Sequence, residues 1–213
     1  MPRAHLTYST LVTDKSDNSI HTTYLLVGLL LVCMSIFQAL PAPWRELLRF
    51  DRNAIGNGEI WRIVTGHYVH LGWGHLALNA AALALGTWIF GADRRPLQWF
   101  NATLVSTLAC GLGLWWLSPG IASCVGLSGV LHGLMIVGTG SWILRGEPVG
   151  WWLAAFWALK LGWEQLRGEV PWTAALAGGA VVTDAHLWGA AGGVLYLLLS
   201  ALWAIWRRGN SRV

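Results

Sequence analysis

Residues 96–144 read PLQWFNATLVSTLACGLGLWWLSPGIASCVGLSGVLHGLMIVGTGSWIL, and none of them is Asp, Glu, Lys or Arg. A helix needs about 20 predominantly apolar residues to cross the hydrocarbon core of a bilayer. The stretch is therefore too long for one crossing but suits two. Ser118-Pro119-Gly120 is a typical turn sequence, and it predicts where the chain reverses between the two helices.

The composition of the whole chain also indicates a membrane protein. Apolar residues make up 55% of the 213 positions and charged residues only 11%, whereas a soluble domain carries about 25% charged residues. The 16 tryptophans suit a membrane–water interface. The formal charge of +4 comes without a dense basic cluster, so it indicates membrane topology and no nucleic-acid partner. Cys33, Cys110 and Cys124 form no Cys-x-x-Cys pair and are expected to be small buried residues.

We predict an all-α, polytopic membrane protein with a bundle of six transmembrane helices. A short polar cytoplasmic tail (1–21), a six-helix domain (22–206) and a basic cytoplasmic tail (207–213) make up the chain. The spans are expected at 22–40, at 74–92, twice within 96–144, at 149–166 and at 183–206. The stretch 41–73 then forms a large outer loop. The Gly-rich stretch Val170–Thr183 is too short to cross and is expected to form a lid-like loop.

The basic residues predict the orientation of this bundle. With both termini inside, eight Lys and Arg residues lie on the cytoplasmic side, namely Arg3, Lys15, Arg94, Arg95, Arg145, Arg207, Arg208 and Arg212. Five lie on the opposite side, namely Arg45, Arg49, Arg52, Arg62 and Arg167. Cytoplasmic loops carry the excess of basic residues, so both termini are expected in the cytoplasm.

Polar side chains inside transmembrane helices cost free energy, so those that occur there usually have a function. Ser128 opens the fourth span within Gly126-Leu127-Ser128-Gly129, where small neighbours allow another backbone to approach the hydroxyl closely. Packing alone would also explain a serine among glycines in a membrane helix.

His186 opens the sixth span. Gly189 and Gly193 follow it at i+3 and i+7, on the same helical face. This smooth stripe predicts tight packing against a neighbouring helix, which would bring the imidazole close to it. Paired with a serine at the same depth, His186 is a candidate general base, and a hydrogen-bonded structural histidine is the alternative.

His75 and Asn79 open the second span and share one face. Both can donate hydrogen bonds, as an oxyanion site requires, although helix capping and interhelical bonding would also explain them. Spans two, four and six all run inward, so these residues, Ser128 and His186 are expected at similar depth near the outer face. The positive dipole ends of the three helices point there as well.

Together these features resemble the rhomboid family of intramembrane serine proteases over about residues 22–206. The matching motifs are Trp61-Arg62, His75 with Asn79, Gly126-x-Ser128-Gly129, and Ala185-His186 with Gly189 and Gly193. The resemblance implies a six-helix core without a cofactor and a Ser128–His186 dyad without a catalytic carboxylate. It also implies an oxyanion site at His75, Asn79 and Leu127. Arg62 could be a solvent-facing loop residue, but the resemblance favours a structural role in holding the outer loop against the bundle.

One position departs from many rhomboids, which have Tyr four residues after the serine. Here it is His132, expected to support the His186 ring. The string from Gly126 to Gly133 is similar to the rhombosortase branch, as are the short length and Lys160 with Glu164. This likeness implies a bacterial inner-membrane enzyme, with its site near the periplasmic side. Its partners would be proteins with C-terminal transmembrane tails, trimmed at Gly-Gly elements.

Lys160 and Glu164 lie at i,i+4 on one face of the fifth span. A structural ion pair is one interpretation, and a border of the route by which a substrate helix enters is the other. Asp184 lies two residues before His186, so its side chain points elsewhere on a helix, and we expect it to be an N-cap.

Three other functions fit the sequence less well. A metalloprotease is disfavoured because no His-Glu-x-x-His motif occurs and no carboxylate has ligand spacing beside the histidines. A catalytically silent rhomboid-like protein that binds membrane clients would usually lack the serine or the histidine. A transporter would show inverted repeats, which are not apparent.

Overall fold

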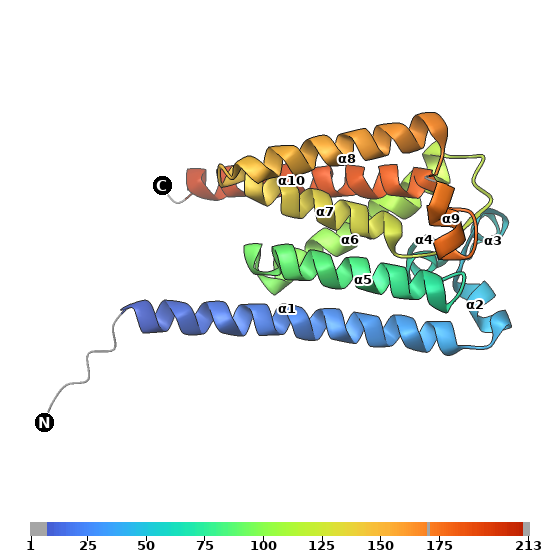
Figure 1. The fold of residues 1–213 in the computed structure, drawn as a ribbon, viewed down its shortest axis with the longest axis horizontal. Helices are drawn as coiled ribbons and strands as arrows, with labels where there is room; N and C mark the ends of the chain where they lie inside the picture. Colours follow the sequence, from blue (N-terminus) through green and yellow to red (C-terminus); the bar gives the residue numbers. More distant parts are fainter. Residues whose placement is uncertain (1–7, 170, 211–213) are drawn as a thin grey trace, which may run out of the picture.

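The computed structural model describes residues 8–169 and 171–210. Among these residues, six long helices run side by side in one bundle (Figure 1). They are α1 (Tyr8–Ala39), α5 (Trp73–Phe90), α6 (Pro96–Leu117), α7 (Ser128–Leu144), α8 (Pro148–Arg167) and α10 (Thr183–Asn210). The outer surface of the bundle is rich in exposed Leu, Ile and Trp side chains. Such a surface suits lipid and would be unusual in water.

Four of the described helices are long and apolar enough to cross a membrane, so the chain is an integral, multi-pass membrane protein. They are α1 over Ser19–Ala39, α5 extended to Asp93, α6 and α10. Helix α7 is apolar but has only 17 residues. Helix α8 carries Lys160, Glu164 and Arg167 among its apolar residues. Six crossings therefore remain a prediction.

Most expected helix positions agree with the structure. Helix α6 ends at Leu117 and α7 begins at Ser128, so the predicted break at 118–120 is confirmed. Helix α1 begins at Tyr8, within the stretch expected as a polar tail, and α10 continues to Asn210, beyond the expected end of the bundle.

The lid-like stretch contains the short helix α9 (Pro171–Ala177), which packs against α5, while Val170 lies outside the described residues. The 3-10 helix η2 (Gly91–Asp93) extends α5 at its other end.

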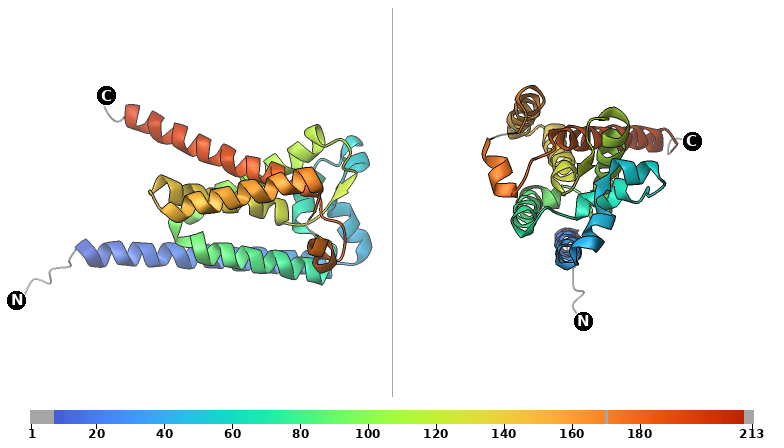
Figure 2. Two further views of the ribbon diagram at one scale, coloured as in Figure 1. Left: turned by 45° about the horizontal axis from the view of Figure 1, so that its top comes forward. Right: turned by 90° about the vertical axis from the view of Figure 1, so that its right-hand side faces the viewer.

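The two ends of the bundle carry different connections between the helices. Helices α1 and α10 bring the two ends of the described chain to the same side, where the α5–α6 and α7–α8 connections also lie (Figures 1 and 2). The opposite side holds the α1–α5 loop, the α6–α7 loop and α9. The arrangement agrees with termini on a common side, and which side is cytoplasmic stays a prediction.

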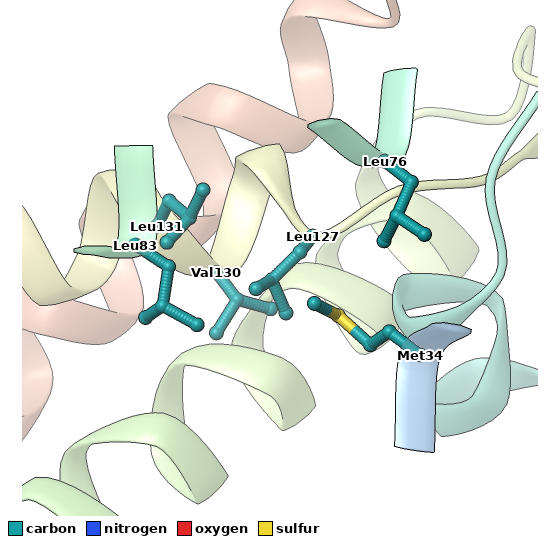
Figure 3. Close-up of a cluster of buried hydrophobic side chains, with 6 residues drawn as sticks. All are labelled: Met34, Leu76, Leu83, Leu127, Val130 and Leu131. Atoms are coloured by element: carbon teal, nitrogen blue, oxygen red, sulfur yellow. The ribbon is translucent and has the colours of Figure 1, made fainter. Parts of the chain in front are cut away.

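Helix α7 is the centre of the bundle. It packs against α5, α6, α8 and α10, and a view along the helix axes shows it in the middle (Figure 2, right). An apolar cluster joins it to α1 and α5 (Figure 3). The buried members of that cluster are Met34, Leu76, Leu83, Leu127, Val130 and Leu131. These contacts fix the start of α7 against the first two long helices.

Short elements make up the outer loop. They are α2 (Ala42–Leu48), β1 (Phe50–Asp51), α3 (Arg52–Gly56), α4 (Arg62–Thr65) and η1 (Gly66–Tyr68). Strand β1 pairs antiparallel with β2 (Ser123–Cys124), with Phe50 opposite Cys124 and Asp51 opposite Ser123. Because β2 lies just before α7, this pair ties the outer loop to the start of the central helix.

Arg52 anchors the same loop to the end of α6. Its guanidinium donates to the carbonyl oxygens of Trp115 (2.8 Å), Ser118 (2.8 Å), Ile121 (2.9 Å) and Leu114 (2.5 Å). The last carbonyls of a helix have no partner within it, so Arg52 supplies the donors that the C-terminus of α6 lacks.

Arg62 is buried and holds the outer loop together. It forms an ion pair with Glu59 at 2.6 Å and donates to the carbonyls of Glu46 and Arg49. Its neighbour Trp61 donates to the carbonyl of Leu47 at 3.1 Å. Both side chains bind α2 to α4. Arg62 is thus structural, as expected, but among the described residues its polar contacts join parts of the outer loop to one another and do not join the loop to the long helices.

Glycines bring α7 and α10 into direct backbone contact. A Cβ atom on Gly189 would overlap the carbonyl group of Gly129, and one on Gly193 would overlap that of Gly133. The stripe on α10 therefore packs against a matching stripe on α7. This contact decides how close the first turns of the two helices lie.

Candidate active site

Ser128 and His186 meet where α7 and α10 begin. The Ser128 Oγ lies 3.0 Å from the His186 Nε2, although the residues are 58 positions apart in the chain. The backbones approach closely there, since a Cβ on Gly129 would lie 2.6 Å from the Ala185 carbonyl oxygen. The Ser128 hydroxyl is therefore within hydrogen-bond distance of the imidazole, as a nucleophile and its base must be.

A carboxylate contacts the other nitrogen of His186. The Glu164 Oε2 lies 3.0 Å from the His186 Nδ1, and both side chains are buried, with exposed fractions of 3% and 5% for the two residues. An ionised carboxylate can only accept, so Nδ1 carries the hydrogen and the lone pair of Nε2 faces Ser128. The resemblance implied a dyad without a carboxylate. The structure places one there, from α8.

Lys160 and His132 close a ring of contacts around this pair. The Lys160 Nζ lies 2.7 Å from the Glu164 Oε1 and 2.8 Å from the His132 Nε2. The His132 Nδ1 lies 2.7 Å from the carbonyl oxygen of Ser128, and its ring stacks on His186 with centroids 4.1 Å apart and planes at 18°. His132 thus packs on the His186 ring, and its own nitrogens face Lys160 and the backbone.

Hydrogen-bond donors on α5 converge on Gly126. This residue has a φ of +113°, and a Cβ there would lie 2.5 Å from the His75 Cε1 and 3.5 Å from the Asn79 Nδ2. The Leu71 N–H donates to the His75 Nδ1 at 3.5 Å, which leaves the hydrogen of the neutral ring on Nε2. The Asn79 Nδ2 is buried without a hydrogen-bond partner among the described residues. Both donors therefore lie beside the segment that leads into Ser128.

Leu127 immediately precedes α7. Its side chain is buried in the cluster shown in Figure 3, which fixes the backbone just before Ser128. The first N–H groups of a helix have no acceptor within it and form its positive end. The start of α7 therefore directs backbone donors and a positive dipole to the same place as His75 and Asn79.

A cavity of about 390 Å³ opens onto this site from the outer loop. Ser128 and His75 form part of its wall, together with Arg45, Arg49 and the segment between α9 and α10. The Nε atoms of both arginines are buried without a partner in the described part of the chain. The cavity connects the serine to the loop side of the bundle and gives water a route to it.

Two histidines of the outer loop, His67 and His70, are held neutral by burial. Burial lowers the pKa of His67 to about 4. It lowers the pKa of His70 to about 3, and the neighbouring His75 contributes to that shift. The His70 and His75 rings contact edge to face with centroids 5.1 Å apart. His67 and His70 are therefore uncharged near neutral pH, and His70 forms part of the cavity wall.

Among the described residues, His132, Glu164 and His186 could together hold a metal ion, because their ligand atoms all lie within 4.8 Å of one another. No carboxylate has ligand spacing beside the histidines in the sequence, but folding brings Glu164 to them. However, the Lys160 ammonium is within hydrogen-bond distance of both His132 and Glu164. A divalent cation would have to displace it, so these residues fit a hydrogen-bonded network better than a metal centre.

Asp184 is not the N-cap that we expected. Helix α10 begins at Thr183, so Asp184 lies within its first turn, where a negative charge still suits the helix dipole. Sequence reasoning also missed the link between Glu164 and His186. The available signal was a pair of charges, Lys160 and Glu164, in an otherwise apolar helix.

Comparison with known proteins agrees with this geometry. The sequence profile of the rhomboid domain matches residues 57–202, which is more than half of the chain and includes α5, α7 and the first part of α10. The chain is also 34% identical over 99 residues to Rhomboid-like protease 5 of Toxoplasma gondii. That match covers 45% of this chain and only 11% of the length of the relative. The chain belongs to the rhomboid family.

Proposed function

We propose that this chain is an intramembrane serine protease with Ser128 as the nucleophile and His186 as the general base. The observation that carries the proposal is the 3.0 Å contact between the Ser128 Oγ and the His186 Nε2, with Nδ1 held by a carboxylate. The Ser128 oxygen attacks the scissile carbonyl carbon while its proton passes to Nε2. The imidazolium then gives that proton to the leaving amine, and water hydrolyses the acyl-enzyme by the same route.

The negative charge on the attacked oxygen needs donors placed in advance. The His75 Nε2, the Asn79 Nδ2 and the backbone at Leu127 meet this requirement in our proposal. The unpartnered Asn79 amide supports it, because a buried donor without an acceptor is costly unless a ligand supplies one.

Rhomboid proteases act on membrane proteins within the bilayer, and we propose a Gly-Gly element near the outer end of a C-terminal transmembrane tail as the target here. The backbone carbonyls of a helix are hydrogen-bonded within it and are not accessible to a nucleophile. The substrate helix must therefore unwind before Ser128 can attack. Glycine lowers the cost of unwinding by about 1 kcal/mol per residue relative to Ala. The site lies at the end of the bundle opposite the termini, so with both termini in the cytoplasm of a bacterial inner membrane it faces the periplasm.

The test uses the full-length chain in liposomes with a fluorophosphonate probe and a tail-anchored reporter. We expect labelling and cleavage in the wild type, loss of both in Ser128→Ala and loss of cleavage in His186→Ala. Ser35→Ala on α1 is the matched control, because that serine bonds within its own helix. A labelled wild type that binds the reporter without cutting it would favour a client-binding protein.

Two further arms separate the finer parts of the proposal. Changing the reporter from Gly-Gly to Leu-Leu should lower cleavage strongly, and equal cleavage of both would refute the Gly-Gly specificity. Cleavage should persist in the presence of a metal chelator. If the chelator abolished cleavage, His132, Glu164 and His186 would have to be regarded as a metal centre.

A further inference from the structure

Helix α8 supplies a buried carboxylate, Glu164, and a partly buried ammonium, Lys160, whose contacts all lead back to the Ser128–His186 pair. Glu164 touches His186 with one carboxylate oxygen and Lys160 with the other, at 3.0 and 2.7 Å. Lys160 in turn touches His132, which contacts the Ser128 carbonyl oxygen. An ion pair that only offset its own cost in lipid would not need these two further partners.

We infer that Glu164 is a positioning residue of the reaction, acting through His186, and that Lys160 keeps Glu164 in place and ionised. The inference rests on the proposed function. The Glu164 oxygen accepts from Nδ1, so it fixes both the tautomer and the orientation of the ring, and leaves the Nε2 lone pair facing Ser128. When His186 takes the serine proton, Glu164 lies next to the new positive charge and stabilises it. Glu164 takes no proton itself.

The Lys160 contacts explain why the arrangement needs a second charge. A carboxylate with a single neutral partner in a buried site would tend to bind a proton and lose its acceptor role. The ammonium donates to the other oxygen and balances the charge. It also donates to the His132 Nε2, so the hydrogen of the neutral His132 ring sits on Nδ1 and points to the Ser128 carbonyl. His132 is then held flat against His186.

A purely structural ion pair and a positioning carboxylate predict different results in a double-variant cycle. Glu164→Gln alone keeps the size of the side chain but removes its charge, and the partly buried Lys160 ammonium loses the carboxylate that balances it. Glu164→Gln combined with Lys160→Met removes both charges. If the pair were only structural, the double variant would recover the wild-type rate. If Glu164 positions His186, the double variant stays as slow as Glu164→Gln.

The experiment measures kcat and KM of the full-length chain in liposomes with the reporter described above. We expect Glu164→Gln to lower kcat by roughly 10²–10⁴-fold, with KM changed by only a few-fold, as for the carboxylate of other serine protease triads. The double variant should lie within about 10-fold of it. Glu147→Gln is the matched control, because it makes the same change in an exposed side chain just before α8. Recovery in the double variant, or an effect on KM alone, would overturn the inference.

A second measurement separates this inference from the proposed function and does not need turnover. In protein labelled with ¹⁵N-histidine, His186 should show a strongly hydrogen-bonded Nδ1–H that disappears in Glu164→Gln. An inactive wild type that shows this signal refutes the protease proposal and leaves the Glu164 contact standing. A wild type that cleaves the reporter without the signal refutes the inference alone.

Discussion

Replacing Gly126 with Ala should damage the reaction more than the fold. Gly126 lies two residues before Ser128 and has a φ of +113°, which L side chains rarely adopt. Its missing side chain leaves the space that the His75 ring fills. The added Cβ would lie 2.5 Å from the His75 Cε1 and 2.8 Å from its Nε2.

The size of the effect follows from these two distances. Carbon atoms normally approach to about 3.5–4.0 Å, so the ring and the new methyl group must separate by about 1 Å. A shift of that size at a catalytic group costs about 10²-fold in rate, similar to the loss of one oxyanion donor. The left-handed backbone adds about 1–2 kcal/mol of strain to the folded state. We therefore expect kcat to fall by about 10²–10³-fold, with a modest loss of thermal stability.

The assay compares kcat, KM and the melting temperature of Gly126→Ala with those of Gly120→Ala. Gly120 lies in the same α6–α7 connection, has no left-handed φ, and a Cβ there would meet no atom within 4 Å. The control should match the wild type in all three values. If Gly126→Ala turned over substrate at the wild-type rate, His75 would not be an oxyanion donor and the account of this loop would be wrong. A change confined to KM would make His75 a binding residue.

Four other substitutions test three separate parts of the structure. Arg52→Met should lower the free energy of unfolding in detergent by about 3 kcal/mol, because two carbonyls in the last turn of α6 and two in the connection after it lose a charged donor. An unchanged melting temperature would contradict this role. Burial holds the pKa of His67 near 4, so the stabilising effect of its neutral ring is complete above pH 6.5 and is lost as the pH falls towards 4. The melting temperature of His67→Gln should therefore fall less on acidification than that of the wild type. In the wild type, His67 accounts for at most about 3 kcal/mol of the loss in the free energy of unfolding. His132→Tyr should keep measurable cleavage, because an aromatic ring still packs on His186, whereas His186→Tyr should abolish it, and equal loss in both would reopen the choice of base.

The long helices could be predicted because charged side chains are rare inside a bilayer, so they indicate where a transmembrane span ends. The uncharged stretch 96–144 predicted two helices and the break between them, and α6 and α7 agree with it. The pairing of Phe50 with Cys124 could not be predicted in this way. Strands of two residues show no alternation, and nothing in a local pattern indicates that an outer loop will pair with a segment more than 70 residues later.

The serine and the histidine could be predicted as neighbours because both open helices that run in the same direction, so both were expected at the same depth. Glu164 could not, since depth alone does not say which helix faces which. Its i,i+4 spacing from Lys160 predicted their mutual contact, which the structure contains. The contact with His186 depends on how α8 lies against α7 and α10, and that is a property of the packed bundle.

The close approach of α7 and α10 links stability to chemistry in this bundle. The hydrophobic effect does not drive helices together in lipid, because lipid tails are as apolar as the helix surfaces. Close packing at small residues and interhelical hydrogen bonds therefore stabilise the association. Gly129 and Gly189 bring the two backbones together, and Ser128 and His186 lie within one turn of that contact. Both reactive side chains are short or rigid, so backbone separation, more than side-chain flexibility, determines their distance. The glycines therefore do two things at once: they hold the helices together, and they hold the serine hydroxyl 3.0 Å from the imidazole.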